Sequence, residues 1–247
     1  NAEHYIGMEH LQIIPLFPLG LTFSPRSVGA DYFAWAKLPE LFPVSFPGVK
    51  TSRDDVLIDV DRDRLDARMK QYFDPTVTHD DLRRVAPGFM TSSARYNAEA
   101  IRDGLRKRGY LPQNLVRYSY RPFDVRWLYW ESETKLLDEK RPEYFPHVQP
   151  DNLWIEARQR QPMDQFDRGM FTRVLADNLG NGLSSYFPAY LYNSSQQAQL
   201  GLFETEPQPL SGRRPNLSDQ AKAYLAELGF TPEDGAPLLF YHTLAVL

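Results

Sequence analysis

Two short polar stretches carry side chains suited to contacts with nucleic acid. Residues 50–53 could offer a lysine, two hydroxyls and an arginine to a phosphate backbone, and residues 158–161 alternate arginine with glutamine. Arginine pairs well with guanine, and glutamine with adenine, in the major groove of DNA, so the second stretch predicts base contacts. The alternatives are an ordinary solvated turn at residues 50–53 and a polar loop without a partner at residues 158–161. The candidate residues are Lys50, Thr51, Ser52, Arg53, Arg158, Gln159, Arg160 and Gln161.

The central stretch, residues 117–130, combines three arginines with six aromatic residues in the sequence RYSYRPFDVRWLYW. Its aromatic and β-branched residues predict two strands, at residues 118–120 and 125–130. Pro122 cannot donate to a sheet ladder, so residues 121–124 are expected at a bulge, a sheet edge or a turn between the two strands.

Two interpretations of this bend stay open. In the structural one, Arg121 and Asp124 form a buried ion pair that fixes the bend. In the functional one, Arg121 and Arg126 project toward the phosphates or base edges of a partner, which a planar guanidinium binds through its fork of donors. Both hold together if a structural pair orients a functional neighbour.

The sequence shows no complete catalytic site. The chain has no cysteine, which excludes disulfides and thiolate metal sites, and its five histidines lack the paired helical spacing of metal ligands. A Gly-rich phosphate loop and a Gly-x-Ser-x-Gly elbow are also absent from the sequence. Residues 133–135 have the Glu-x-Lys pattern of metal nucleases, but such triplets are common by chance. We therefore expect no catalytic residue and no metal site in this chain.

Helix and strand signals alternate along the chain. Further strands are predicted at residues 11–17, 56–60, 152–157, 170–176 and 185–192. Helices are predicted from Asp61 or Asp63 to about Tyr72, over 98–108 between Asn97 and Gly109, over 218–228, and from Pro232 and Pro237 onward. Residues 131–143 are charged and read as an exposed loop or hairpin tip. The pattern predicts an α+β fold with a mixed or antiparallel sheet and a small C-terminal helical region.

The predicted organisation is an α+β domain over 1–192, a linker or long loop over 193–215, and a helical region over 216–247. No apolar run approaches the roughly 20 residues of a membrane span, and no signal peptide is visible. These features, with the absence of cysteine, predict a cytoplasmic protein. Because the chain starts without methionine and stops inside an apolar, helix-like run, we expect a fragment of a longer protein.

Net charge is −4, which argues weakly against a nucleic-acid binder, since such proteins usually have a basic surface. The charges are unevenly distributed, however. Residues 102–126 carry seven lysines and arginines, whereas acids dominate elsewhere, for example over 54–66. This distribution is compatible with a basic face on an acidic body.

Several motifs occur in a fixed order and together carry a family resemblance. The motifs are KTSRD at 50–54, YRPFDVRW at 120–127, RPE at 141–143, RQ at 158–159, FPAYLY at 187–192 and FYH at 240–242. With these motifs the chain closely resembles the C-terminal specificity domain of type ISP restriction-modification enzymes, which is similar to a domain of related DNA methylases. The resemblance covers roughly residues 35–247, and its most specific part is Tyr120–Asp124.

The resemblance implies a target recognition domain for double-stranded DNA. The chain would present its site to an adenine methyltransferase and a nuclease located elsewhere in the parent chain. The fragment would then hold no cofactor, while the parent would use S-adenosylmethionine and, where its ATPase and nuclease parts work, ATP and Mg. The competing hypothesis is a protein-interaction module that docks its aromatic surface on a neighbouring domain without base readout. For the DNA hypothesis, phosphate or architectural roles are expected for Lys50, Thr51, Arg53, Arg121 and Arg126, and base contacts for Arg158, Arg160 and Gln161.

Overall fold

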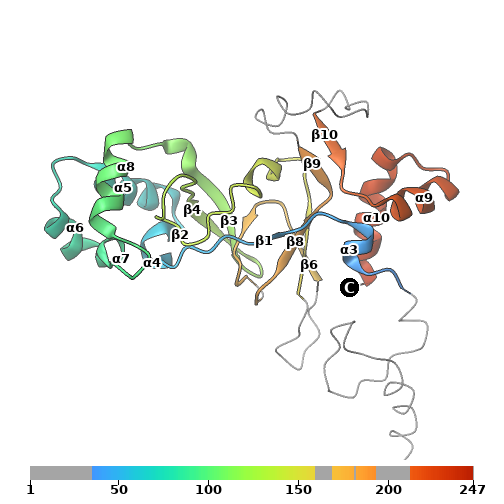
Figure 1. Ribbon diagram of the computed structural model, residues 1–247, viewed down its shortest axis with the longest axis horizontal. Coiled ribbons are helices and arrows are strands. Elements are labelled where there is room, and N and C mark those ends of the chain that lie inside the picture. Colours follow the sequence, from blue (N-terminus) through green and yellow to red (C-terminus); the bar gives the residue numbers. More distant parts are fainter. Residues whose placement is uncertain (1–34, 159–168, 181, 193–211, 247) are drawn as a thin grey trace, which may run out of the picture.

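The computed structural model describes residues 35–158, 169–180, 182–192 and 212–246. Figure 1 shows an elongated arrangement, with one group of helices at one end, strands in the middle and a second group of helices at the other end. The helices are α3 (Leu38–Leu41), α4 (Asp54–Leu57), α5 (Arg62–Phe73), α6 (His79–Val85), α7 (Pro87–Met90), α8 (Ala98–Arg108), α9 (Asp219–Glu227) and α10 (Pro232–Val246), with 3₁₀ turns η3 (Pro112–Asn114) and η4 (Phe145–His147).

The described strands form three sheets. One sheet has the order β2-β4-β3-β7, with β7 parallel to β3 and the other pairs antiparallel, and a second has the antiparallel order β1-β8-β5-β6. A third pairs β9 with β10. This mixture of helices with mixed and antiparallel sheets confirms the predicted α+β class. The strands are β1 (Phe46–Pro47), β2 (Ile58–Asp59), β3 (Leu115–Arg121), β4 (Asp124–Tyr129), β5 (Trp154–Ala157), β6 (Gly169–Thr172), β7 (Leu175–Ala176), β8 (Ser185–Pro188), β9 (Tyr190–Tyr192) and β10 (Arg213–Pro215).

Local capping signals place three of the helices where the sequence predicts them. The Asp61 carboxylate accepts from two backbone N–H groups at the start of α5, and Asn97 accepts from Ala100 N at 3.0 Å at the start of α8. Ser218 caps α9 in the same way. Each cap satisfies a backbone donor that would otherwise lack a partner, which fixes the first turn.

The second sheet separates two hydrophobic cores. Successive residues of β5 point to opposite faces. Trp154 therefore packs in the larger core, with residues of α5, α7 and α8, while Ile155 packs in the smaller core, with residues of α9 and α10. The larger core joins α5, α7 and α8 to the β3–β4 hairpin. The smaller core holds Phe42 and Phe240 edge to face at 6.2 Å between ring centroids. Both faces of β5 are therefore buried, which fixes its register.

The structure corrects several predicted strands. Over the predicted strand 56–60, the chain first forms α4, whose first turn carries Asp54 and Asp55, and only Ile58–Asp59 pairs with β4. The predicted strand 170–176 is divided between two sheets, because β6 pairs with β5 whereas β7 pairs with β3. The predicted strand 185–192 is likewise divided into β8 and β9.

Two further predictions were wrong, one about the exposure of residues 131–143 and one about how the C-terminal helices are divided. Residues 131–143 are not simply an exposed loop, because Glu131, Leu136 and Leu137 are buried. The C-terminal helices predicted at Pro232 and Pro237 are one helix, α10. Proline lacks the N–H that would bond to the carbonyl four residues earlier. That carbonyl, on Glu233, instead lies 3.4 Å from the Tyr190 hydroxyl, which donates to it.

The remaining predictions of organisation are only partly covered. The predicted strand 11–17 lies outside the described residues, as does most of the predicted linker 193–215. The end of that linker, Arg213–Pro215, forms β10 and pairs with β9. No helix in the described ranges is both long and apolar enough to cross a bilayer.

Candidate nucleic-acid interface

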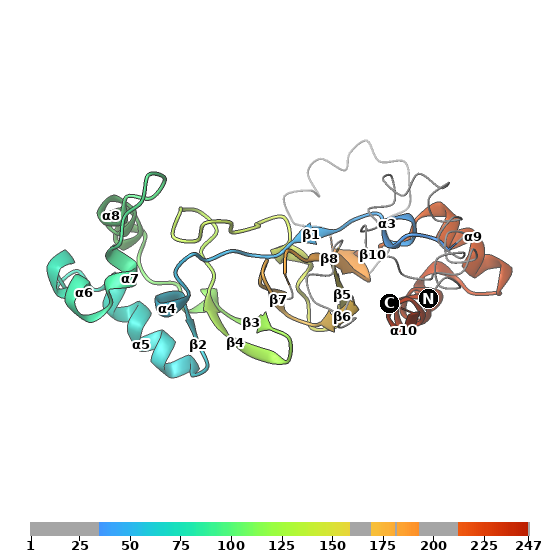
Figure 2. The same ribbon diagram turned by 90° about the horizontal axis from the view of Figure 1, so that it is seen from below.

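The β3–β4 hairpin presents the central motif at its turn, as predicted. Tyr118 lies opposite Arg126 in the ladder, and the register shifts between Ser119 and Arg121. The turn itself is Pro122-Phe123, with Phe123 in the left-handed region at φ +62°. Figure 2 shows the hairpin extending from the end of the molecule that holds α5–α8 toward β7.

Two arginines at the turn contact one tyrosine ring. The guanidinium carbon of Arg121 lies 3.9 Å from the centroid of Tyr120, and that of Arg126 lies 4.2 Å from it. The Tyr120 hydroxyl donates to Asp54 Oδ2 at 2.9 Å. Asp54 follows residues 50–53, so this bond joins two of the predicted clusters.

The predicted ion pair between Arg121 and Asp124 was wrong. Asp124 pairs with Arg126, whose Nε and Nη2 lie 2.9 and 2.7 Å from Asp124 Oδ2. Residues two apart on a strand share a face, so Arg126 is placed to reach this carboxylate. Its hydrogen bonds hold the pKa of Asp124 below the ordinary value. Arg121 instead lies 3.4 Å from Asp177, and both arginines keep about a third of their side chains exposed.

The polar groups of residues 50–53 bond largely within the protein. Lys50 Nζ lies 2.9 Å from Asp138 Oδ2 and lowers the pKa of that carboxyl. Ser52 Oγ donates to the same oxygen at 3.1 Å, and the Thr51 hydroxyl donates to Asp54. Arg53 donates to Leu136 O at 2.9 Å and lies over the ring of Tyr96. This loop therefore has an evident architectural role, and its contact with phosphate stays a prediction.

Asp177 is the buried centre that connects these parts. The Tyr118 hydroxyl donates to its Oδ2 at 2.7 Å, and the Leu179 N–H donates to its Oδ1 at 2.6 Å. Its backbone bridges to Val49, next to residues 50–53. Burial raises the pKa of Asp177, against the lowering effects of the Tyr118 hydrogen bond and the Arg121 charge. The hairpin turn and the 50–53 loop are thus both attached to the strand end that carries Asp177.

Arg158 lies beside Gly182. It follows β5 directly, and a Cβ placed on Gly182 would lie 3.9 Å from its Nη1. The neighbouring Ser184 donates to the buried Glu156 at 2.6 Å. Arg158 is thus next to Gly182, which follows Asp177 in the chain. The other members of the predicted base-reading stretch, Gln159, Arg160 and Gln161, lie outside the described residues.

The family model for the Type ISP C-terminal specificity domain matches residues 40–247 of the chain. The chain belongs to this family. The match confirms the resemblance carried by the ordered motifs. Comparison with curated proteins finds no match.

Solved structures show the same fold for the specificity domain. The "cryoEM structure DrdV-DNA complex" is 18% identical, has a TM-score of 0.54, and is matched over 87% of this chain and 22% of that chain. The "ATP-dependent Type ISP restriction-modification enzyme LlaBIII bound to DNA" is 21% identical, with a TM-score of 0.52, over 78% of this chain and 12% of that one. The chain thus spans less than a quarter of either neighbour.

Sequence reasoning missed the acids that organise the specificity domain's candidate site. Asp177 and Asp138 gave no motif, because each acquires its arginine or lysine partner from a distant part of the chain. The one available signal in the sequence for Asp177 was that this carboxylate directly follows the apolar pair Leu175-Ala176. Within the described ranges, no group of three or more histidine or acidic side chains is arranged to hold a metal ion. Glu133 of the Glu-x-Lys triplet pairs with Arg108 at 3.1 Å.

Replacing Asp177 with asparagine is expected to change the pH dependence of stability. A carboxyl whose pKa is raised in the folded state contributes stability below its unfolded value of 3.8 and loses it as the pH rises through the folded pKa. The Asp177→Asn variant cannot lose a proton there. Wild type should therefore lose stability relative to the variant across this range, measured by urea unfolding at a series of pH values. A relative gain by wild type would mean that Arg121 dominates and lowers this pKa.

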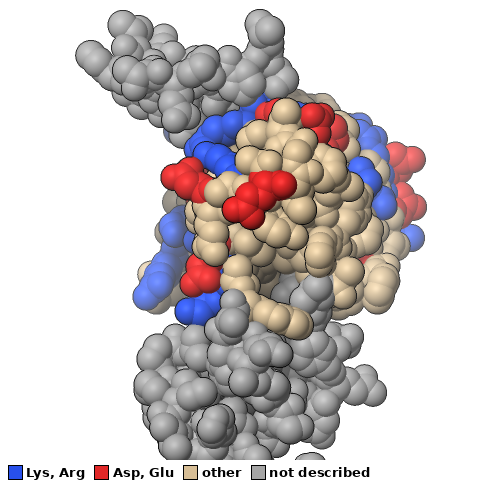
Figure 3. All heavy atoms as spheres, turned by 90° about the vertical axis from the view of Figure 1, so that its right-hand side faces the viewer, with Lys and Arg blue, Asp and Glu red and all other residues tan. Residues whose placement is uncertain are grey.

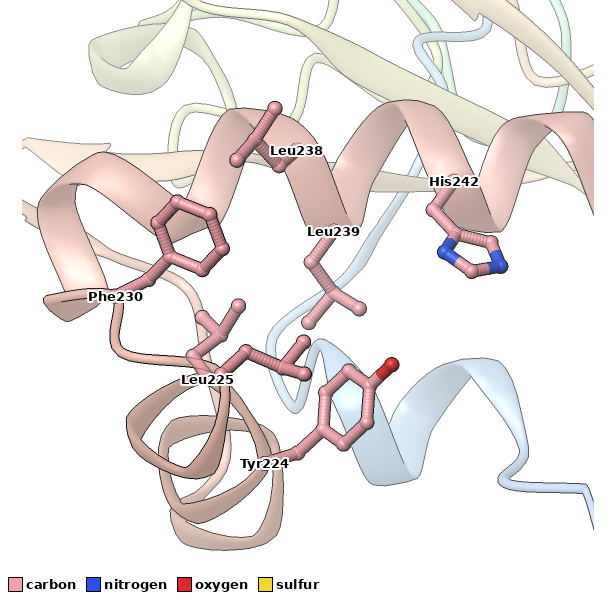
Figure 4. A pocket seen from close by; sticks show the side chains of 7 residues that line it. Tyr224, Leu225, Phe230, Leu238, Leu239 and His242 are labelled. Atoms are coloured by element: carbon pink, nitrogen blue, oxygen red, sulfur yellow. The ribbon is translucent and has the colours of Figure 1, made fainter.

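A second surface of the specificity domain is apolar and lies between α9 and α10. Figure 4 shows side chains of the two helices facing each other across a pocket. Several of the lining residues are about half exposed, and Figure 3 shows this end of the molecule as largely uncharged, with charged residues around its edge. The pocket is lined by Tyr224, Leu225, Leu228, Phe230, Leu238, Leu239 and His242.

Proposed function

We propose that this chain recognises a specific sequence in duplex DNA for a restriction-modification enzyme. It would present the site to an adenine methyltransferase and a nuclease located elsewhere in the same protein. The supporting observation is that one region around Asp177 gathers the hairpin arginines, Arg158 and the 50–53 loop, in a chain of the specificity-domain family. The two neighbours of similar fold are described as DNA-bound.

The geometry suggests that some residues of this region contact phosphates and others contact bases. Arg121 and Arg126 are held against Tyr120, so their guanidinium groups are oriented before any ligand arrives. Fixed arginines suit phosphate oxygens, which position a protein on DNA without reading its sequence. Residues 158–161 begin at the adjoining end of β5 and would supply base contacts. Because net charge is −4, the methyltransferase would provide many of the remaining phosphate contacts.

The cofactors follow from this function and belong to the parent protein. S-adenosylmethionine would serve the methyltransferase, and ATP and Mg would serve the ATPase and nuclease parts. This chain would contribute recognition alone, in the cytoplasm, where the DNA substrate and these cofactors meet.

A domain-docking module is the second candidate, and the apolar pocket between α9 and α10 favours it. Tyr224, Leu228 and Leu238 are about half exposed there, and apolar contact with the methyltransferase domain would cover them. The two functions respond differently to salt. Affinity for DNA falls steeply with salt because counterions are released, whereas apolar docking changes little.

Binding of mixed-sequence duplex DNA, measured at low and moderate salt, tests the proposed function. We expect binding by the complete protein, with an affinity that falls steeply as salt rises. Absence of binding at low salt would contradict DNA recognition. A partner domain that binds this chain with the same affinity at both salt concentrations would then favour docking.

Removal of Arg158 is expected to relax specificity at one base pair. An arginine that contacts a base contributes about 1–3 kcal/mol of discrimination, so Arg158→Ala should lose that preference at a single position. Competition between duplexes that differ at single base pairs measures this effect. Arg84→Ala is the matched control, because Arg84 is an exposed arginine on α6, far from the end of β5 (Figure 1). A uniform loss of affinity for all sequences would instead assign Arg158 to a phosphate.

A further inference from the structure

One arginine of the β3–β4 hairpin differs from the two at its turn. Arg121 and Arg126 each pair with an acidic side chain of this chain, which balances their charge. Arg117, in β3, is exposed, and within the described part of the chain no acidic side chain pairs with it. Its guanidinium carbon instead lies 5.0 Å from the centroid of the Trp127 ring. The ring orients this guanidinium group but does not neutralise it.

A second guanidinium group reaches the same ring. Arg62, at the start of α5, has its guanidinium carbon 5.5 Å from the Trp127 centroid. Its ion pair with Asp63 spans 3.9 Å, and both side chains are exposed, so the pair contributes little in water. Asp59 lies opposite Trp127 in the ladder, but this buried carboxylate pairs with Arg68. Two guanidinium groups are thus held against one ring with no strongly bound acid between them.

The exposed face of the hairpin continues from this ring toward the turn. Arg117 lies opposite Trp127 and Ser119 lies opposite Val125, and residues two apart in a strand share a face. Val125 is 41% exposed, and Ser119 and Trp127 are partly exposed. We call this surface the Trp127 face. Its members are Arg62, Arg117, Ser119, Val125 and Trp127, which offer two guanidinium groups and a hydroxyl as donors.

The phosphate backbone of duplex DNA matches these donors. Guanidinium groups and serine hydroxyls both donate to phosphate oxygens, and a duplex carries one negative charge per roughly 1.7 Å of its axis. Arg117 and Arg121 lie four residues apart in β3, which is roughly 14 Å at the rise of a strand. A duplex that contacts the arginines at the turn can therefore also lie along the Trp127 face.

We propose that the Trp127 face binds the phosphate backbone of the duplex beside the base pairs that are recognised, with Arg117 as the main contact. This inference rests on the proposed function and extends its DNA footprint from the hairpin turn toward α5. Trp127 is a positioning residue, because its ring orients the guanidinium groups before DNA arrives. Since a phosphate contact reads no base, it stabilises complexes with all sequences alike.

The test is binding of a mixed-sequence duplex by the complete protein, measured over a series of salt concentrations. Arg117→Ala should weaken binding about tenfold at low salt, the effect of losing a hydrogen-bonded charge. The slope of log affinity against log salt should fall by about one. In competition between duplexes that differ at single base pairs, the variant should keep the preferences of wild type.

Matched variants separate a phosphate contact from a general effect of charge or damage. Arg84→Ala changes net charge by the same amount from an exposed position on α6 and should keep the affinity and slope of wild type. Arg117→Lys should keep the slope but lose part of the affinity, because lysine lacks the planar fork of donors. Trp127→Leu should likewise keep the slope and weaken binding less than Arg117→Ala does. Melting temperatures check that each variant is folded.

The outcomes distinguish this inference from the function on which it rests. If wild type binds no duplex at low salt, DNA recognition fails and the phosphate contact fails with it. If wild type binds and Arg117→Ala keeps its affinity and slope, the contact alone is overturned, and an acidic protein surface becomes the fitting partner of the Trp127 face. A loss confined to duplexes with one particular base pair would also overturn it, by assigning Arg117 to base readout. A uniform loss with a lower slope is the result we expect.

Discussion

Gly48→Ala is expected to lower the free energy of unfolding by about 3 kcal/mol or more, because the backbone of Asp177 occupies the space a side chain would need. A Cβ on Gly48 would lie 2.5 Å from Asn178 N and from the Asp177 carbonyl carbon. These are backbone atoms that cannot rotate away. The neighbouring Val49 N–H donates to Ala176 O at 2.9 Å, so relief of the clash would break this connection. Chemical denaturation of the purified variant measures the loss.

Gly104→Ala is the control for Gly48→Ala. Gly104 lies in α8 with no atom within 4 Å of a Cβ placed on it, so alanine should stabilise the helix by about 0.5–1 kcal/mol. A loss of stability in Gly48→Ala together with a gain in Gly104→Ala would support the close approach of Gly48 to the backbone of Asp177. A Gly48→Ala variant as stable as wild type would contradict that approach and the convergence of the candidate site.

Arg108→Ala is expected to destabilise the fold by about 3–5 kcal/mol, the effect of leaving a buried charge without its partner. Glu131 is 0% exposed, and its Oε2 lies 2.6 Å from Arg108 Nη2. Its other oxygen accepts the Glu133 N–H at 2.7 Å, so the carboxylate also fixes the start of the 131–143 segment. Denaturant unfolding should show the loss.

Glu133→Ala provides the comparison within the same cluster. Glu133 also pairs with Arg108, at 3.1 Å, but its side chain is 65% exposed, so the variant should lose less than about 1 kcal/mol. Arg108→Met combined with Glu131→Leu should recover much of the loss from Arg108→Ala, because no buried charge is left. Equal losses of stability in Arg108→Ala and Glu133→Ala would contradict the burial of the Arg108–Glu131 pair.

The parts of the fold that the sequence predicts well depend on neighbouring residues. Asp61, Asn97 and Ser218 each cap the helix that begins at the next residue, and Pro122 lies in the hairpin turn that it predicts. The predicted strand 170–176 could not be divided correctly from the sequence, because β6 and β7 are separated by the distant strands with which they pair. Likewise, the sequence does not show that the Glu233 carbonyl, which Pro237 leaves without a helical donor, accepts from the distant Tyr190 hydroxyl.

The candidate site shows the same contrast. Residue types and spacing identify the arginines at the hairpin and at the end of β5, and family membership supports DNA recognition. The acid that each arginine contacts was not predictable from the sequence. Asp124 lies close to both arginines in the sequence but pairs with Arg126, and Arg121 pairs with the distant Asp177. The 97% exposure of Phe123 was also not predictable, because residues 121–124 were expected at a bulge, a sheet edge or a turn, and phenylalanine is among the residues most often buried.

Selection from a pool of random duplex DNA, followed by sequencing, tests the central claim most directly. The complete protein is incubated with the pool at low and moderate salt, and the bound duplexes are recovered. The proposed function predicts one enriched motif at both salt concentrations, with a preference at one position that Arg158→Ala abolishes. Binding without enrichment at either salt concentration would contradict sequence recognition and leave a non-specific DNA clamp.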